Sequence, residues 1–122
     1  MPAVNLEQLS AYLSSRPDVI CAVVFGSAQN GIAKPGSDLD LAVYFTKKPE
    51  GEAFIRFLVD AAEAAEFDVI DLVDLGAADP ILAFEALSGR FLCRTDPEKT
   101  AELTSLVSRE YEDTMVRLNS AA

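Results

Sequence analysis

Two aspartates, Asp38 and Asp40, are separated by a single residue at the start of the apolar run LDLAVYF, residues 39–45. Side chains alternate between the two faces of a strand, so Leu39 and Leu41 would lie on one face and both carboxylates on the other. Two carboxylates this close repel each other unless a cation lies between them. Because oxygen ligands suit Mg²⁺ or Mn²⁺ better than zinc, we expect this pair to bind one of these two ions.

A third acid comes from the run DVIDLVDL, residues 68–75, which also alternates like a strand. Asp71 would share a face with Val69 and Val73, and burying a lone carboxylate among apolar side chains is costly unless the carboxylate is paired. We therefore expect Asp71 to share the metal ion with the first two aspartates, either as a ligand or as the general base. Asp74, near the end of this strand, is the alternative third acid.

Gly26 and Ser27 follow another apolar run, DVICAVVF, at residues 18–25. A glycine at the end of a buried strand allows a bulky ligand to approach the backbone closely. Backbone N–H groups and the Ser27 hydroxyl can then hold an anion such as a triphosphate, whereas in the simpler interpretation Ser27 only caps a turn. Phosphate-binding amides beside metal-binding carboxylates are typical of phosphoryl and nucleotidyl transfer.

The spacing Gly26-Ser27, ten residues, then Asp38-x-Asp40 resembles the signature of the DNA polymerase β-like nucleotidyltransferase superfamily. Chain length and element order resemble its minimal branch, and look most like the MntA-type antitoxins of type VII toxin–antitoxin pairs. The resemblance implies transfer of AMP from ATP to a tyrosine of a helical HEPN-domain RNase toxin, HepT, which is thereby silenced. It also implies that Asp38, Asp40 and Asp71 are catalytic metal ligands and that Gly26 and Ser27 bind the nucleotide.

The chain departs from this branch directly after the glycine and serine. Arginines are usual there, whereas residues 28–31 read AQNG. Losing one charged phosphate contact costs about 1.5–3 kcal/mol, so the hold on phosphate would pass to Lys34, to Arg90 or to the metal ions. Two other functions therefore stay open: an antitoxin of weak activity that acts by direct binding, and a small-molecule nucleotidyltransferase.

The composition excludes several classes of function. The 122 residues include 20 acidic and 10 basic ones, for a formal charge of −10, which opposes binding to nucleic acid and disfavours nucleotide addition to RNA. The chain has no histidine, which excludes Ser-His-Asp triads and most zinc sites. We expect Cys21 and Cys93 to be free thiols in the core. No segment resembles a signal peptide or a membrane span, so we expect a cytoplasmic protein without a membrane partner.

Apolar spacing predicts the elements that must position these residues. Helices are expected near residues 6–13, 50–66, 81–88 and 98–119, and strands at 18–25, 39–45, 68–75 and 90–94. Asn5, Asp79 and Asp96 precede helical segments as N-caps, the last two followed by proline. The order α-β-β-α-β-α-β-α predicts one α/β (α+β) nucleotidyltransferase-like domain, residues 1–122. Its sheet should be short and mixed, with about four strands flanked by helices.

The last predicted helix carries an apolar stripe that is long for so small a chain. Core packing accounts for most of it, but a domain of this size leaves part of such a stripe uncovered. We expect the uncovered part to contact the toxin or a second copy of the chain. The residues of the stripe are Leu103, Leu106, Val107, Tyr111, Met115 and Leu118.

Overall fold

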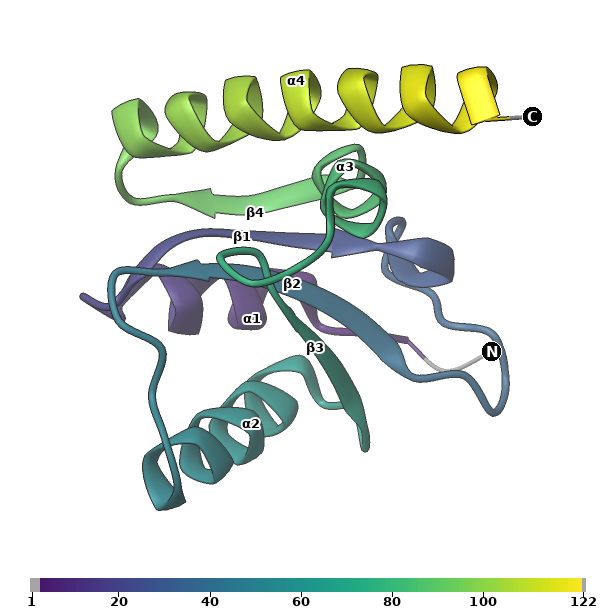
Figure 1. Cartoon of the computed structure of the whole chain (residues 1–122). Coiled ribbons are helices and arrows are strands. Elements are labelled where there is room, and N and C mark those ends of the chain that lie inside the picture. Colours follow the sequence, from purple (N-terminus) through teal and green to yellow (C-terminus); the bar gives the residue numbers. More distant parts are fainter. Residues whose placement is uncertain (1–2, 122) are drawn as a thin grey trace.

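A four-stranded sheet with the strand order β3-β2-β1-β4 forms the centre of the fold (Figure 1). β1 (Val19–Phe25) is antiparallel to β2 (Leu39–Phe45) and to β4 (Arg90–Arg94), whereas β2 is parallel to β3 (Ile70–Asp74). The computed structural model describes residues 3–121. The predicted short mixed sheet is confirmed.

Helices cover both faces of this sheet. α1 (Leu6–Ser14) and α2 (Glu52–Ala65) pack on one face, and α3 (Pro80–Leu87) and α4 (Pro97–Ala121) pack on the other (Figure 1). The predicted order of helices and strands is confirmed, with one addition. A three-residue 3₁₀ turn, η1 (Gly26–Ala28), follows β1 directly.

Three helices begin at the capping residues expected from the sequence. Asn5, Asp79 and Asp96 each accept a hydrogen bond from the backbone N–H three residues further on, at 3.0 Å. Such a bond satisfies one of the N–H groups that a helix leaves without a partner in its first turn. These caps therefore fix where α1, α3 and α4 start.

The alternation along β2 decides which face the first acids occupy. Leu39, Leu41 and Val43 are buried with residues of α1 and α2, and Ala42 is buried with residues of α3 and α4. Since side chains alternate along a strand, Asp40 points to the same face as Ala42. The face predicted for this carboxylate is confirmed.

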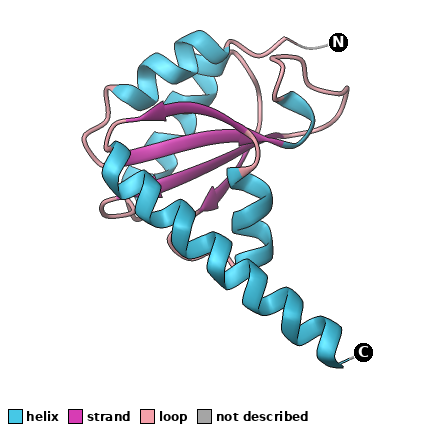
Figure 2. Ribbon diagram, turned by 90° about the horizontal axis from the view of Figure 1, so that it is seen from above, coloured by secondary structure: helices cyan, strands magenta, loops and turns pink. Residues whose placement is uncertain are grey.

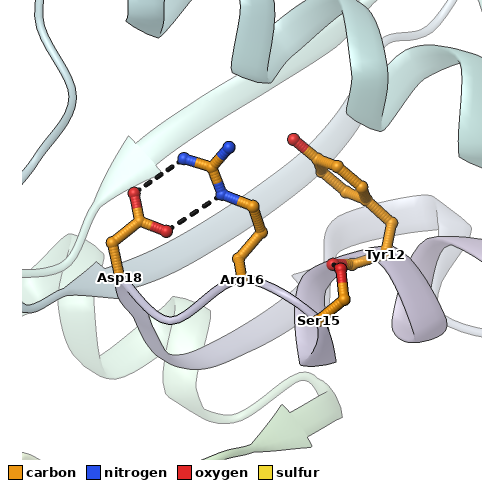
Figure 3. Close-up of polar contacts among 4 residues, drawn as sticks. All are labelled: Tyr12, Ser15, Arg16 and Asp18. Atoms are coloured by element: carbon orange, nitrogen blue, oxygen red, sulfur yellow. Dashed lines mark hydrogen bonds and ion pairs between the residues drawn. The ribbon is translucent and has the colours of Figure 1, made fainter.

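The turn between α1 and β1 is held by an ion pair. The guanidinium of Arg16 donates from Nη2 and Nε to the two carboxylate oxygens of Asp18, at 2.7 and 2.9 Å (Figure 3). The ring of Tyr12 lies beside this guanidinium, and burial raises the pKa of the Tyr12 hydroxyl. The ion pair joins two residues of this turn.

Both cysteines are free thiols, as predicted. Cys21 is buried and Cys93 is half-buried, and burial raises the pKa of each thiol. A thiol with a raised pKa is a poor nucleophile at neutral pH, so neither residue is a candidate for covalent chemistry.

Within residues 3–121, no helix combines the length and the apolar character needed to cross a membrane.

Candidate functional site

One end of the sheet gathers the residues singled out from the sequence. Because β2 and β4 run antiparallel to β1, and β3 runs parallel to β2, the last residues of β1 lie beside the first residues of the other three strands. This end of the sheet therefore carries all five predicted residues: Gly26, Ser27, Asp38, Asp40 and Asp71.

Two of the acids face each other across neighbouring strands. Asp40 on β2 is the register partner of Asp71 on β3. Neighbouring strands lie about 5 Å apart, and both side chains point to the face covered by α3 and α4, as Ala42 and Val73 do two residues further on. Asp38 lies one residue before the start of β2 and is exposed.

The surroundings of Asp40 disfavour the charged form of its carboxyl group. It is half-buried, and this burial raises the pKa of its carboxyl group, followed in size by repulsion from the carboxylates of Asp71, Asp38 and Glu85. Negative charge from three other acids therefore acts on one carboxylate. A cation placed among them would relieve this repulsion and favour the ionised form.

Glu85 was not among the residues predicted for this site. It belongs to α3, which packs on β1, and its side chain is exposed. The signal in the sequence is that Glu85 is the only charged residue in the segment PILAFEAL. A lone charge in an apolar helix marks the position at which that helix is open to solvent.

The expectation that Asp71 is buried in an apolar row is wrong. β3 is an edge strand of five residues, and Asp71 is exposed, as is Val69 just before it. Its register nevertheless places Asp71 opposite Asp40. The alternative acid, Asp74, lies at the far end of β3 opposite Val43, where its carboxylate accepts a hydrogen bond from a turn N–H.

The backbone brings the acids to one end of the sheet, but their side chains do not converge. Across residues 3–121, no three Asp, Glu, His or Cys side chains lie closely enough together to hold a metal ion. Asp38 and Asp71 are exposed carboxylates, and exposed side chains change rotamer on the picosecond to nanosecond timescale. Both carboxylates can therefore change orientation without movement of the backbone.

Gly26 brings the backbone against the Asp40 carboxylate. Its φ angle is +73°, and a Cβ atom at this position would lie 2.5 Å from Oδ2 of Asp40. Any larger residue would be strained and would displace the carboxylate. Ser27 follows as an exposed residue within η1. The end of β1 therefore presents bare backbone beside Asp40, followed by an exposed serine.

Two basic residues lie at this end of the molecule. Arg90, the first residue of β4, donates from Nη1 to the backbone oxygen of Gln29 at 3.3 Å, just after η1. Lys34 lines a pocket of about 290 Å³ that also includes Asp38 and Phe67. Of the two residues suggested as substitutes for the missing arginines, Lys34 belongs to the segment that follows Ser27, and Arg90 contacts that segment from β4.

Comparison with protein families gives one match over most of the chain. The family described as "Polymerase beta, Nucleotidyltransferase" matches residues 7–98, a range that includes every residue of the site described above. A comparison with curated proteins found no match.

Solved structures of toxin–antitoxin complexes contain chains of the same fold. A chain of a mutant MntA–HepT complex has a TM-score of 0.75 and 21% identity, with 94% of each chain covered. A chain of a toxin–antitoxin structure with AMP-PNP has a TM-score of 0.73 and 22% identity, again with 94% of each chain covered. A chain of a third structure, that of the tri-AMPylated HEPN toxin of Shewanella oneidensis in complex with MNT antitoxin, has a TM-score of 0.69 and 20% identity. The match covers 95% of this chain and 92% of that one. At these identities the likeness establishes the fold.

Proposed function

The chain belongs to the polymerase beta nucleotidyltransferase family, and we propose that it is a protein adenylyltransferase that acts as an antitoxin. It transfers AMP from ATP to a tyrosine of a helical HEPN-domain toxin of the HepT type and thereby neutralises that toxin. The observation that carries this proposal is the pairing of Asp40 with Asp71 beside Gly26. The fold that this chain shares with structures containing AMP-PNP and a tri-AMPylated toxin supports it.

In this proposal the triphosphate of ATP lies over Gly26 and Ser27. The positive φ of Gly26 and the absence of a side chain leave the backbone N–H groups of this turn accessible to phosphate oxygens. The exposed Ser27 hydroxyl adds one more donor. The α-phosphate then lies next to Asp38 and Asp40, on the β2 side of the turn.

Because the reaction consumes ATP, we expect the protein to act in the cytoplasm.

Asp38, Asp40 and Asp71 are proposed to hold Mg²⁺ or Mn²⁺. The donor set fits, because it consists of carboxylate oxygens alone. Burial, followed by repulsion from neighbouring carboxylates, raises the pKa of Asp40, and a cation would offset that repulsion. Ions bound there would neutralise charge on the phosphates and lower the pKa of the attacking hydroxyl. The β2–β3 register sets the backbone positions of two of these ligands, Asp40 and Asp71.

The acceptor is a tyrosine hydroxyl, whose ordinary pKa of about 10 leaves it protonated at neutral pH. Its oxygen attacks the α-phosphorus, the bond from this phosphorus to the bridging oxygen breaks, and pyrophosphate leaves. Asp71 is exposed on β3, the outer strand of the sheet. From there it accepts the hydroxyl proton directly or contributes as a metal ligand.

The distal half of α4 is the proposed contact with the toxin. Among the described side chains of this helix Val107 is the last buried one, and Tyr111 still stacks on Phe84 of α3. The C-terminal end of α4 then projects past the rest of the molecule (Figure 2). Val116 and Leu118 are 63% and 53% exposed on this extension. Exposed apolar side chains on a projecting helix are suited to a protein partner. A second copy of the chain is the alternative partner.

The exposed helix also favours a second candidate function, neutralisation of the toxin by direct binding. No arginine or lysine follows the Gly26-Ser27 pair within residues 28–33, so this antitoxin would have weak activity and act through its interface. The two functions differ in one consequence. A catalytically inactive variant still neutralises the toxin in cells if binding is sufficient, and fails to do so if transfer is required.

Transfer of label from α-labelled ATP to the co-purified toxin tests the proposal. The double variant Asp38→Asn plus Asp40→Asn should lose transfer completely and keep the fold. A matched control is Glu50→Gln plus Glu52→Gln, which removes two exposed carboxylates with the same spacing at the start of α2. The control should retain activity. Full transfer by the double variant would falsify the assignment of the site.

A further inference from the structure

We propose that the outer edge of β3 binds the acceptor segment of the toxin as an added strand, with the acceptor tyrosine opposite Asp71. The inference deepens the proposed function and rests on it, because it assigns a binding mode to the tyrosine that receives AMP. The occupant of this edge is an extended, basic segment of the toxin. A helical segment cannot add to a sheet, so this tyrosine belongs to a connecting or terminal segment of that protein.

The outer edge of β3 is open for pairing with a further strand. β3 is the last strand of the sheet, with β2 on its inner side (Figure 1). The backbone oxygen of Val69 and the N–H of Leu75 bond to β2, at 3.0 and 2.9 Å. Backbone groups alternate in direction along a strand, so Ile70 and Leu72 direct their N–H and C=O groups away from β2. These groups are available to an added strand.

The register of β3 places a side chain of the added strand on the face of the acids. Asp40 and Asp71 share the face of the sheet on which α3 and α4 pack, and residues opposite each other in neighbouring strands share a face. A tyrosine opposite Asp71 would lie one strand spacing, about 5 Å, from Asp71 and two spacings from Asp40. Val69 is 52% exposed, so the helices leave the start of β3 uncovered on this face. The tyrosine hydroxyl can therefore approach the acids from the edge of the sheet.

A groove beside the start of β3 favours basic residues next to the tyrosine. The groove has a volume of about 520 Å³ and lies between α2 and the segment that leads into β3. Its lining combines apolar side chains with three acids, among them Leu58, Phe67, Glu63, Glu66 and Asp68. The neighbours of the tyrosine in the added strand direct their side chains to this opposite face. A lysine or arginine there would lay its aliphatic stem on the apolar lining and its charge beside the acids.

The acids of β3 oppose a second copy of the chain as the occupant. Antiparallel pairing of two β3 edges through Ile70 and Leu72 would place the two Asp71 side chains directly opposite each other or diagonally adjacent. Like charges at such positions destabilise a pair of strands. Asp68 and Asp74 add negative charge to the same segment. A basic segment would be attracted by these charges, which favours the acceptor segment of the toxin over self-association.

Amide hydrogen exchange followed by NMR, on the full chain alone and in its complex with the toxin, tests the strand pairing. Mg²⁺ and α,β-methylene-ATP keep the complex in its state before transfer, because the bond that must break is replaced in this analogue. Exchange at Ile70 and Leu72 should slow by about tenfold or more in the complex, since each N–H gains a hydrogen-bond partner. Amides at the outer edge of β4 should keep their rates. Unchanged exchange at Ile70 and Leu72 in the assembled complex would overturn the inference.

Charge reversal in the groove tests the chemistry of the partner. Glu63 and Asp68 are exposed and lie outside the predicted site. Glu63→Lys plus Asp68→Lys should lower kcat/KM for transfer to the toxin by about tenfold or more, mainly through KM, because like charges now face each other. The affinity for ATP should not change.

The matched control is Glu98→Lys plus Glu102→Lys, which makes the same change in net charge at two exposed positions near the start of α4. It should leave kcat/KM unchanged. Equal losses in the two variants, or an unchanged kcat/KM in the groove variant, would overturn the inference. A wild-type chain that transfers no AMP to the toxin would instead overturn the proposed function itself.

Discussion

Asp40 lies directly opposite Asp71 in the parallel ladder of β2 and β3, although one acid precedes α2 in the chain and the other follows it. The pairing concentrates charge at the place where the end of β1 presents bare backbone at Gly26. In a metal-free protein this arrangement opposes folding, because like charges repel. A site for a cationic ligand requires such a concentration of negative charge, and its cost is offset when the ligand binds.

Replacing Asp40 with asparagine should therefore stabilise the metal-free protein. The pKa of Asp40 is raised in the folded state, so ionisation of this group favours the unfolded chain at every pH above that raised value. At pH 7 we expect Asp40→Asn to raise Tm by about 2–5 °C in thermal unfolding followed by circular dichroism. Transfer activity should be lost in the same variant.

The pH dependence of this stabilisation is the internal control. As the pH falls through the raised pKa of Asp40, the carboxyl group becomes protonated and the penalty on the wild type declines. Below the ordinary value of 3.8 the carboxyl group is protonated in both the folded and the unfolded chain, and the penalty is absent. The Tm difference between Asp40→Asn and the wild type should shrink over this range. A difference that stays constant with pH would contradict the electrostatic explanation.

Gly26→Ala should impair both stability and transfer. The positive φ alone costs about 1–2 kcal/mol for a residue with a Cβ atom, and the new methyl group would also displace the Asp40 carboxylate. Gly36→Ala is the matched control, because Gly36 has a φ of +78° and nothing within 4 Å of its Cβ position. Urea unfolding should show the larger loss for Gly26→Ala. Equal losses with intact transfer would mean that the contact with Asp40 is irrelevant.

Divalent ions should stabilise the protein through the three aspartates. We expect added Mg²⁺ to raise the Tm of the wild type, since binding to the folded state alone increases stability. The double variant Asp38→Asn plus Asp40→Asn should show no such increase, and EDTA should abolish transfer by the wild type. A rise of equal size in both proteins would place the ion elsewhere.

The exposed face of α4 should be necessary for binding the toxin. Val116→Asp plus Leu118→Asp introduces charge on the projecting part of the helix, and we expect it to abolish co-purification with the toxin. ATP binding and Tm should not change, because both residues are more than half exposed.

A second pair of substitutions on α4 serves as the control for charge. Ala101→Asp plus Ser105→Asp adds two acids at exposed positions near the start of the helix, away from its projecting part. This variant should still co-purify with the toxin. Loss of the complex in both variants would show that acidity alone weakens it, and retention in both would place the interface elsewhere.

Much of the fold follows from local patterns in the sequence. The caps at Asn5, Asp79 and Asp96 and the alternation along β2 depend on residues a few positions apart, and the structure confirms them. The face of Asp40 follows from the same alternation. Strand order and register are not local, so the sequence placed Asp71 near these acids without showing that it pairs with Asp40.

The mistaken burial of Asp71 has the same origin. An apolar run such as DVIDLVDL is expected to lie inside a sheet, but whether the strand is central or at an edge depends on which strands pair, and β3 is at the edge. Glu85 and the contact of Arg90 with Gln29 also depend on tertiary packing. Each of them joins segments that are far apart in the chain.

The intact mass of the toxin, after co-expression with this chain, tests the central claim most directly. With the wild type we expect the toxin mass to increase by whole multiples of one AMP unit. With Asp38→Asn plus Asp40→Asn we expect the unmodified mass. An unmodified toxin beside the wild-type chain, neutralised all the same, would contradict AMP transfer and leave neutralisation by binding.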